Sequence, residues 1–221
     1  MLSAYWGAGQ ALGLFLPETW REWLLLSGYL FLFVTLLFRD RSNLEQFSLR
    51  KWIGWLVLGF LALIASQLFP ISLDPISFPL VSEGSEPVSV YLLAAVPSLL
   101  AGVVLGPAPA LLVGMSAGLG RALSQSHQVY DLFHYAFAAW LAAVLLGVRY
   151  RGQRYRVLRN PVVSGTLSQS SIAFMAGFTV FFVSVGATLL SRLDMALTVL
   201  LQNIFPLFLE GLSGGIIILL I

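Results

Sequence analysis

Seven long apolar segments, separated by short polar stretches, constrain this chain more than any other feature of its sequence. Each approaches the ~20 apolar residues that a helix needs to cross the hydrocarbon core of a bilayer. Only 10% of the 221 residues are charged, against about 25% in soluble globular domains. The sequence therefore predicts an all-α fold, a polytopic integral membrane helix bundle of about seven transmembrane helices. We place these at Trp23–Phe38, Trp52–Phe69, Val90–Gly106, Ala108–Leu123, Leu132–Val148, Val163–Leu190 and Leu197–Ile221.

The basic residues predict how the bundle is oriented. The loop Arg39–Lys51 holds four basic residues, and the loop Arg149–Asn160 holds five and no acid. The loop Pro70–Ser89 carries acids but no base. Because basic loops stay on the cytoplasmic side, we expect the N-terminus outside and the C-terminus inside, in the plasma (inner) membrane of a bacterium.

The chain divides into two parts. Residues 1–51 form an N-terminal interfacial segment and the first transmembrane helix, and residues 52–221 form a six-helix membrane core with an outer loop at 70–89. Within the first part, Tyr5–Leu16 is apolar but short, and we interpret it as an interfacial helix that ends before Pro17. Several prolines predict that the outer loop is extended or turned rather than helical. It either rests on the membrane surface or folds as a cap over the mouth of the bundle.

Glycines recur at four-residue spacing in several segments. Such pairs let helix backbones approach closely, which is how helices associate in lipid. The alternative is that they make room for a ligand. The pairs are Gly102 with Gly106, Gly114 with Gly118, and Gly211 with Gly215.

One acidic residue, Glu210, lies near the middle of the last segment. Asn203, Pro206, Glu210 and Gly214 recur at three- and four-residue steps, so they share one helix face. A charge inside a span is costly and usually faces protein. We therefore predict that this polar stripe faces the bundle interior. Glu210 either makes a structural hydrogen bond to the sixth segment, whose polar cluster includes Gln169, or contacts a ligand or cation.

A second group of charges lies where the fourth and fifth segments meet. Arg121 closes the fourth segment, Asp131 begins the fifth, and His134 follows on the same face as Asp131. One interpretation is a salt bridge between Arg121 and Asp131 that pins the hairpin. Another is a polar binding mouth, suited to an anion or a zwitterion. The spacing matches no strong metal motif, and we predict neither a metal site nor a cofactor.

Several function classes are excluded or disfavoured. The chain has no Cys, which excludes a disulfide scaffold and a thiol nucleophile. No nucleophile elbow, P-loop or HExxH motif is present, so we predict that this segment is not itself an enzyme. A formal net charge of +2 is too small for a nucleic-acid footprint.

The residues VPSLLAGVVLGPAPALLVGMSAGLGRAL, Val96–Leu123, resemble two membrane families. The S components of energy-coupling-factor vitamin transporters have a similar pair of short helices around a glycine–proline turn. The LytS-type five-transmembrane sensor domains have a hairpin with an ending comparable to Gly118–Arg121, although Gly120 stands where that family often has His. The first resemblance implies that the second to seventh segments form an S-component-like core in which the loop 70–89 caps the ligand.

These observations lead us to expect a sensor or receptor module that functions in signal transduction. The last segment is apolar up to Ile221, which favours a following cytoplasmic effector such as a kinase, cyclase or phosphatase. A substrate-binding transport subunit and an accessory subunit of a larger membrane complex are the alternatives. The expected partners are the lipid bilayer, a small-molecule ligand, and either a second copy of the chain in a homodimer or other membrane subunits. We expect no nucleic acid.

Overall fold

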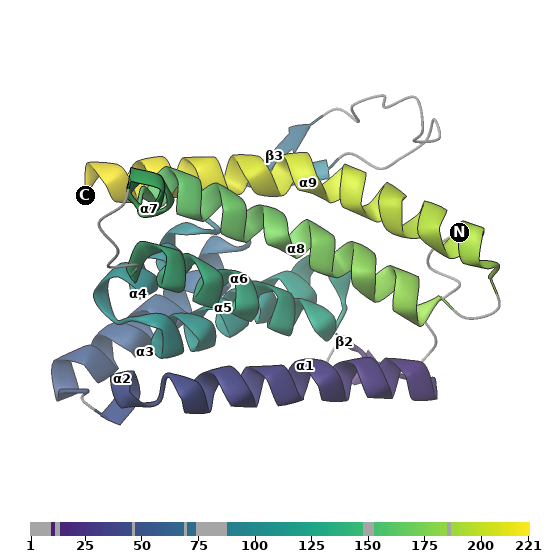
Figure 1. The fold of residues 1–221 in the computed structure, drawn as a ribbon, viewed down its shortest axis with the longest axis horizontal. Helices are drawn as coiled ribbons and strands as arrows, with labels where there is room; N and C mark the ends of the chain where they lie inside the picture. Colours follow the sequence, from purple (N-terminus) through teal and green to yellow (C-terminus); the bar gives the residue numbers. More distant parts are fainter. Residues whose placement is uncertain are drawn as a thin grey trace.

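Helices make up most of the chain. The computed structural model describes residues 10–11, 14–45, 47–68, 70–73, 88–147, 153–184 and 187–221, and there it is a helix bundle (Figure 1). Each of the seven predicted segments contains a helix, which confirms the all-α fold. These helices are α1 (Trp20–Arg39), α3 (Leu49–Ala65), α4 (Val96–Val104), α5 (Pro107–Arg121), α6 (Tyr130–Gly147), α8 (Pro161–Val183) and α9 (Leu189–Leu220). Two short helices, α2 (Ser42–Glu45) and α7 (Gln153–Leu158), lie between them in the chain.

The helices differ in their capacity to cross a bilayer. Within the described residues, four helices (α1, α6, α8 and α9) are long and apolar enough to cross a membrane. Helices α3 and α5 are shorter, and α4 has only 9 residues, or about 14 Å of helix against a hydrocarbon core of ~30 Å. The chain thus has the character of an integral membrane protein.

The third segment is not the continuous helix that we predicted at Val90–Gly106. Its first residues form strand β4 (Val88–Tyr91), which pairs antiparallel with β3 (Pro70–Leu73). A turn follows, and α4 starts at Val96 with a proline in its first turn. The alternation of Val and Ser before Tyr91 suits a strand, and Pro97 suits a helix start. Both strands agree with the extended outer loop; residues 74–87 of that loop lie outside the described residues.

Two further boundaries differ from our predictions. Helix α8 ends at Val183, and Leu189 and Leu190 belong to α9, whose start is capped by the side chain of Thr188. The described part of Tyr5–Leu16 is not helical but forms the paired strands β1 (Gln10–Ala11) and β2 (Leu14–Phe15). Gly13, a weak helix former, lies between these strands, and the Phe15 N–H donates to the carbonyl of His127 at 2.6 Å.

The glycine pairs act in helix packing, as predicted. A Cβ added at Gly102 would lie 3.0 Å from the Cβ of Ala143 on α6. Gly114 and Gly118 of α5 face the backbone of α6, and Gly211 and Gly215 of α9 face the backbone of α8. Gly106 has a different role: its φ of 96° forms the corner between α4 and α5, a conformation that a side chain would oppose.

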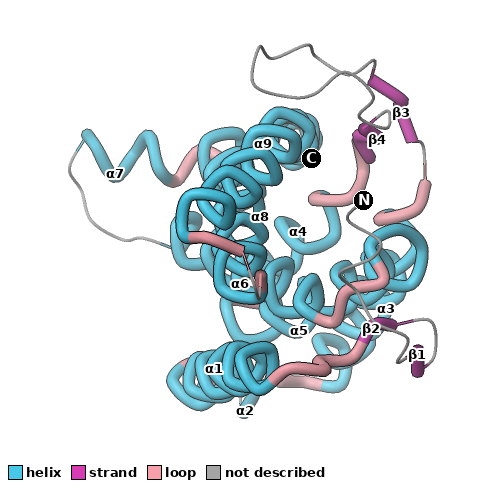
Figure 2. The backbone as a smooth tube through the Cα atoms, turned by 90° about the vertical axis from the view of Figure 1, so that its right-hand side faces the viewer, coloured by secondary structure: helices cyan, strands magenta, loops and turns pink. Residues whose placement is uncertain are grey.

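Helices α5 and α6 lie in the middle of the bundle, with α3, α8 and α9 around them (Figure 2). Helix α1 lies on the flank, where Tyr29 and Phe33 pack on Phe133 of α6. Its opposite face is exposed, as at Phe31. This pattern suits a helix with protein on one side and lipid on the other.

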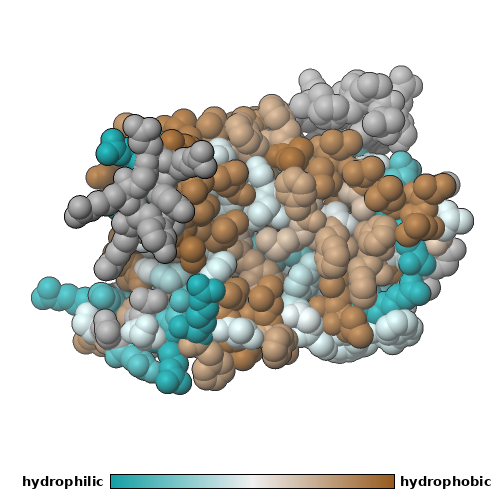
Figure 3. Space-filling view, in the orientation of Figure 1, coloured by the Kyte–Doolittle hydropathy of each residue, from teal (hydrophilic) through white to brown (hydrophobic). Residues whose placement is uncertain are grey.

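The surface has an apolar band in the middle and hydrophilic residues toward the two ends (Figure 3). The short helices α2 and α7 lie at the same end as the C-terminus (Figure 1). Since the two predicted basic loops contain α2 and α7, the described parts of both loops lie at one end of the molecule.

Candidate functional site

A buried ion pair joins α5 to α9. Arg121, the last residue of α5, donates from Nη2 to Oε1 of Glu210, and their side chains are only 9% and 1% exposed. Glu210 thus faces protein, as predicted. The specific partners that we predicted are wrong, because Arg121 binds Glu210 instead of Asp131, and Glu210 binds Arg121 instead of the cluster around Gln169. The end of α5 and the middle of α9 lie close enough in the fold for the two side chains to meet.

Strand β4 completes the surroundings of this pair. The Tyr91 N–H donates to Oε1 of Glu210 at 2.9 Å, and the Arg121 guanidinium lies 4.1 Å from the centre of the Tyr91 ring. The Tyr135 ring of α6 is 5.8 Å away from the guanidinium. Non-helical backbone at membrane depth is tolerated only where protein buries it or a cavity adjoins it. The non-helical backbone of β4, which interrupts the third segment, therefore lies at this site.

A π-helical turn supplies a further partner. Helix α5 continues into η2 (Ala122–Ser126), which ends at His127 in the left-handed conformation. This turn holds Gln125, whose Oε1 accepts a 2.7 Å hydrogen bond from Nη1 of Arg121. Such π-turns are frequent at functional sites.

A cavity of about 600 Å³ lies against the ion pair. That volume is within the ~300–1,000 Å³ typical of small-molecule sites. One part of its wall is polar, from β4, α5, η2 and α6, and another part, from α8 and α9, is mainly apolar. The polar and aromatic lining residues are Ser89, Tyr91, Arg121, Gln125, Ser126, Gln128, Asp131, Tyr135, Asn203 and Glu210, and the apolar ones are Ile172, Ala176, Val180, Val199, Pro206 and Leu207.

Four of the six predicted ligand-binding residues line this cavity: Arg121, Asp131, Asn203 and Glu210. Asn203 donates from Nδ2 to the Val199 carbonyl at 2.8 Å, which leaves its Oδ1 available. Gln169 is buried but does not belong to the lining. The stripe Asn203–Pro206–Glu210 thus faces one cavity, as its helical spacing predicted.

His134 is the other predicted residue that the structure places elsewhere. It is 1% exposed, and its Nε2 lies 3.0 Å from Oγ1 of Thr179 on α8. The Tyr29 hydroxyl of α1 lies 2.9 Å from the same Thr179 oxygen. On the other side, Nδ1 of His134 lies 3.3 Å from Oδ1 of Asp131. His134 therefore links α1 and α8 to Asp131, which itself lines the cavity.

The ion pair has unused hydrogen-bonding capacity. Among the described residues, Oε2 of Glu210 and Nε of Arg121 are buried and have no hydrogen-bond partner. A charged group that is buried without a partner costs more than the ~1–3 kcal/mol of a neutral one.

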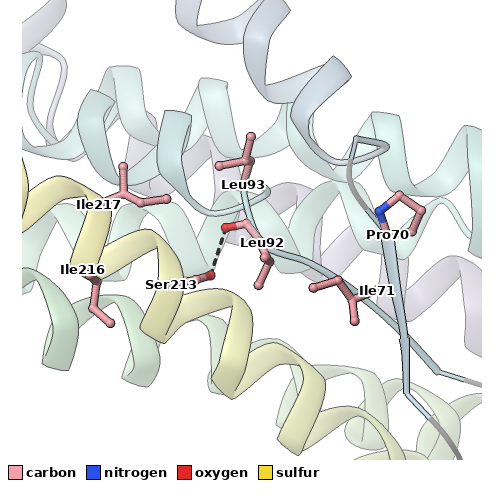
Figure 4. A pocket seen from close by; sticks show the side chains of 7 residues that line it. All are labelled: Pro70, Ile71, Leu92, Leu93, Ser213, Ile216 and Ile217. Atoms are coloured by element: carbon pink, nitrogen blue, oxygen red, sulfur yellow. Dashed lines mark hydrogen bonds between the residues drawn. The ribbon is translucent and has the colours of Figure 1, made fainter.

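An apolar groove of about 590 Å³ adjoins the same segment of chain (Figure 4). Pro70 and Ile71 of β3 line it together with Leu92 and Leu93. Ser213, Ile216 and Ile217 of α9 complete the lining. The Ser213 hydroxyl donates to the carbonyl of Leu92 at 2.9 Å. The chain around residues 91–92 is therefore attached to α9 at two points, through Glu210 and through Ser213.

Sequence reasoning missed Tyr91, Gln125 and Tyr135 as residues of the site. The alternating pattern before Tyr91 is a strand signal inside an apolar segment. Gln125 belongs to the polar run Ser124–Gln128, which begins three residues after Arg121. Tyr135 lies one helical turn after Asp131, on the same face of α6. Within the described residues, no group of three or more His, Asp or Glu side chains is arranged to hold a metal ion.

Comparison with known proteins leaves the function to be argued from this cavity. No protein-family model, no curated protein and no solved structure matches the chain. The resemblance to S components and LytS-type sensor domains stays a prediction from the residues of the α4–α5 hairpin.

Proposed function

We propose that this chain is a membrane-embedded receptor module, which binds a small molecule in the cavity and passes the response along α9. The observation that carries the proposal is the course of α9. This helix supplies Asn203, Pro206, Leu207 and Glu210 to the cavity and continues without interruption to Leu220 at the C-terminal end. One helix therefore joins the ligand site to the far end of the molecule.

The response follows from the contacts of Glu210. This carboxylate holds α9 to Arg121 and to the Tyr91 N–H. A ligand that binds one arrangement of these contacts better than another shifts the population of α9 positions by that difference in affinity. Pro206, one turn earlier, lacks the N–H of a regular helix, which makes this part of α9 the easiest to bend.

The bundle is proposed to lie in a bacterial inner membrane with its C-terminus in the cytoplasm. The gathering of α2, α7 and the C-terminus at one end supports this orientation (Figure 1), since these segments carry the basic loops. In the proposed topology of seven crossings, α4 spans only part of the bilayer. The strand and turn before α4 complete the third crossing. The receptor is proposed to act as a homodimer on a cytoplasmic effector.

A spin-label experiment tests the receptor proposal. The chain has no Cys, so Leu220→Cys and Val104→Cys, both at exposed residues, give one labelled pair in nanodiscs. Phe31→Cys with Phe60→Cys, on α1 and α3, is the reference pair. The probes are 2-phenylethylammonium, 2-phenylethanol and 3-phenylpropanoate, each up to ~10 mM, because fragments of this size bind weakly.

We expect a probe that binds to change the distance distribution of the α9 pair and to leave the reference pair unchanged. Binding without any change in the α9 pair contradicts the receptor proposal. Failure of all three probes to bind contradicts the cavity as a ligand site.

The transport alternative has one observation in its favour. Ser89 and Tyr91 of β4 line the cavity, and β4 pairs with β3 across the outer loop, as a loop that closes over a substrate would. In that case the chain binds a membrane coupling subunit and ATPases. Purification of the tagged chain from native membranes tests this, because a transport subunit retains an ATPase and a receptor module does not.

A further inference from the structure

We propose that the ligand of the cavity is a small organic cation with an apolar body, whose ammonium group is bound by the carboxylate of Asp131. This inference rests on the proposed binding function of the cavity. It replaces the anion or zwitterion that the sequence alone suggested. The argument depends on which charges remain uncompensated around the cavity.

Three charged residues line the cavity: Arg121, Asp131 and Glu210. Arg121 and Glu210 form an ion pair and neutralise one another. Asp131 is left, and among the described residues its carboxylate contacts His134. His134 itself is not part of the lining. The lining therefore carries one net negative charge.

The accessible carboxylate of the lining also favours a ligand with hydrogen-bond donors. Oε2 of Glu210 has no partner among the described residues, but it is buried. Asp131 has 16% of its side chain exposed, and its Oδ1 faces His134. An ammonium group has three donors and no acceptor, so it suits the carboxylate of Asp131.

An anionic ligand meets the opposite situation. To reach the Arg121 guanidinium it must compete with Glu210, which already occupies Nη2, and with Gln125, which occupies Nη1. Displacing Glu210 would leave a buried carboxylate without its counter-charge. Arg121 therefore serves mainly to hold Glu210 in place.

The opposite wall defines the rest of the ligand. Ile172, Ala176 and Val180 lie on one face of α8, and Val199 and Leu207 of α9 adjoin them in the lining. A strongly hydrated inorganic cation gains nothing from this wall, whereas an apolar body buries its surface there. The geometry thus fits a molecule with a charged end and an apolar end.

A series of probes that differ mainly in charge tests the inference on the full chain in nanodiscs. Binding of 2-phenylethylammonium, 2-phenylethanol and 3-phenylpropanoate is measured by saturation-transfer NMR and calorimetry. We expect the ammonium to bind at least about tenfold more tightly than the other two, since a hydrogen bond to a charged group contributes ~1.5–3 kcal/mol. Asp131→Asn should remove most of this preference. Asp194→Asn, an equal charge change at an exposed residue of α9, should not.

Equal binding of the three probes, or tighter binding of the carboxylate, overturns the cationic ligand. An ammonium preference that survives Asp131→Asn overturns the assigned carboxylate. The spin-label measurement above separates the two proposals. If the carboxylate probe binds preferentially and moves α9, the receptor proposal stands and the cationic ligand is contradicted. If the ammonium probe binds preferentially without moving α9, the cationic ligand stands and the receptor proposal is contradicted.

Discussion

At the scale of single residues, the buried Arg121–Glu210 ion pair is the feature of the bundle interior that is most sensitive to substitution. Each charge is buried, and each is compensated mainly by the other, with help from Gln125 and from the Tyr91 N–H. A buried pair of this kind contributes little net stability relative to apolar residues, but removing one partner leaves an uncompensated charge. Its importance therefore lies in the positions that it sets for α5, α9 and β4.

A double-mutant cycle on this pair is the prediction at this scale. We expect Arg121→Met and Glu210→Gln each to lower the free energy of unfolding by about 3–5 kcal/mol, because each leaves a buried charge without its partner. The double variant should lose clearly less than the sum of the two. Denaturant titration in detergent micelles measures this, with Asp194→Asn as a control that should stay within about 0.5 kcal/mol. Additive losses would show that the charges are not coupled.

At the scale of elements, close backbone contact explains why α5 and α6 pack as they do. A side chain at Gly118 would meet the carbonyl oxygen of Asp131, with the carbonyl carbon 2.8 Å away. The same contact places Asp131 beside the end of α5, where Arg121 lies. The glycine spacing that the sequence shows is thus also what brings polar residues of two helices to one cavity.

Gly118→Ala and Gly28→Ala make a matched pair of tests for this contact. We expect Gly118→Ala to lower the free energy of unfolding by about 1–3 kcal/mol, because backbone atoms of α6 have to move. Gly28 of α1 has no atom within 4 Å of an added Cβ, so Gly28→Ala should stabilise the helix by up to ~1 kcal/mol. Thermal unfolding monitored by circular dichroism in micelles compares the two. A Gly118→Ala variant as stable as the parent chain would remove the close-contact argument.

At the scale of the whole molecule, charge and apolar surface are arranged along one axis. The apolar band in the middle of the face drawn in Figure 3 and the position of α2, α7 and the C-terminus at one end are the arrangement expected of a protein embedded in a bilayer.

The prediction at this scale concerns single-cysteine labelling, since the chain has no Cys of its own. A membrane-impermeant maleimide should label Glu18→Cys in intact cells, and should label Arg156→Cys only after permeabilisation, because both residues are exposed at opposite ends. Labelling of Arg156→Cys in intact cells would reverse the orientation.

The amino-acid sequence by itself predicted the all-α fold, a helix within each of the seven segments, the closely packed glycines and the burial of Glu210, but not strand β4 within the third segment. Hydropathy and helical spacing are properties of neighbouring residues, so a local pattern is enough to predict them. The partner of Arg121 was different, because Glu210 lies 89 residues away and only the tertiary fold brings the two side chains together. For the same reason the structure alone showed that Tyr91 belongs to the site and that His134 and Gln169 do not line it. Which charges cancel depends on these long-range contacts, and the proposal of a cationic ligand rests on them.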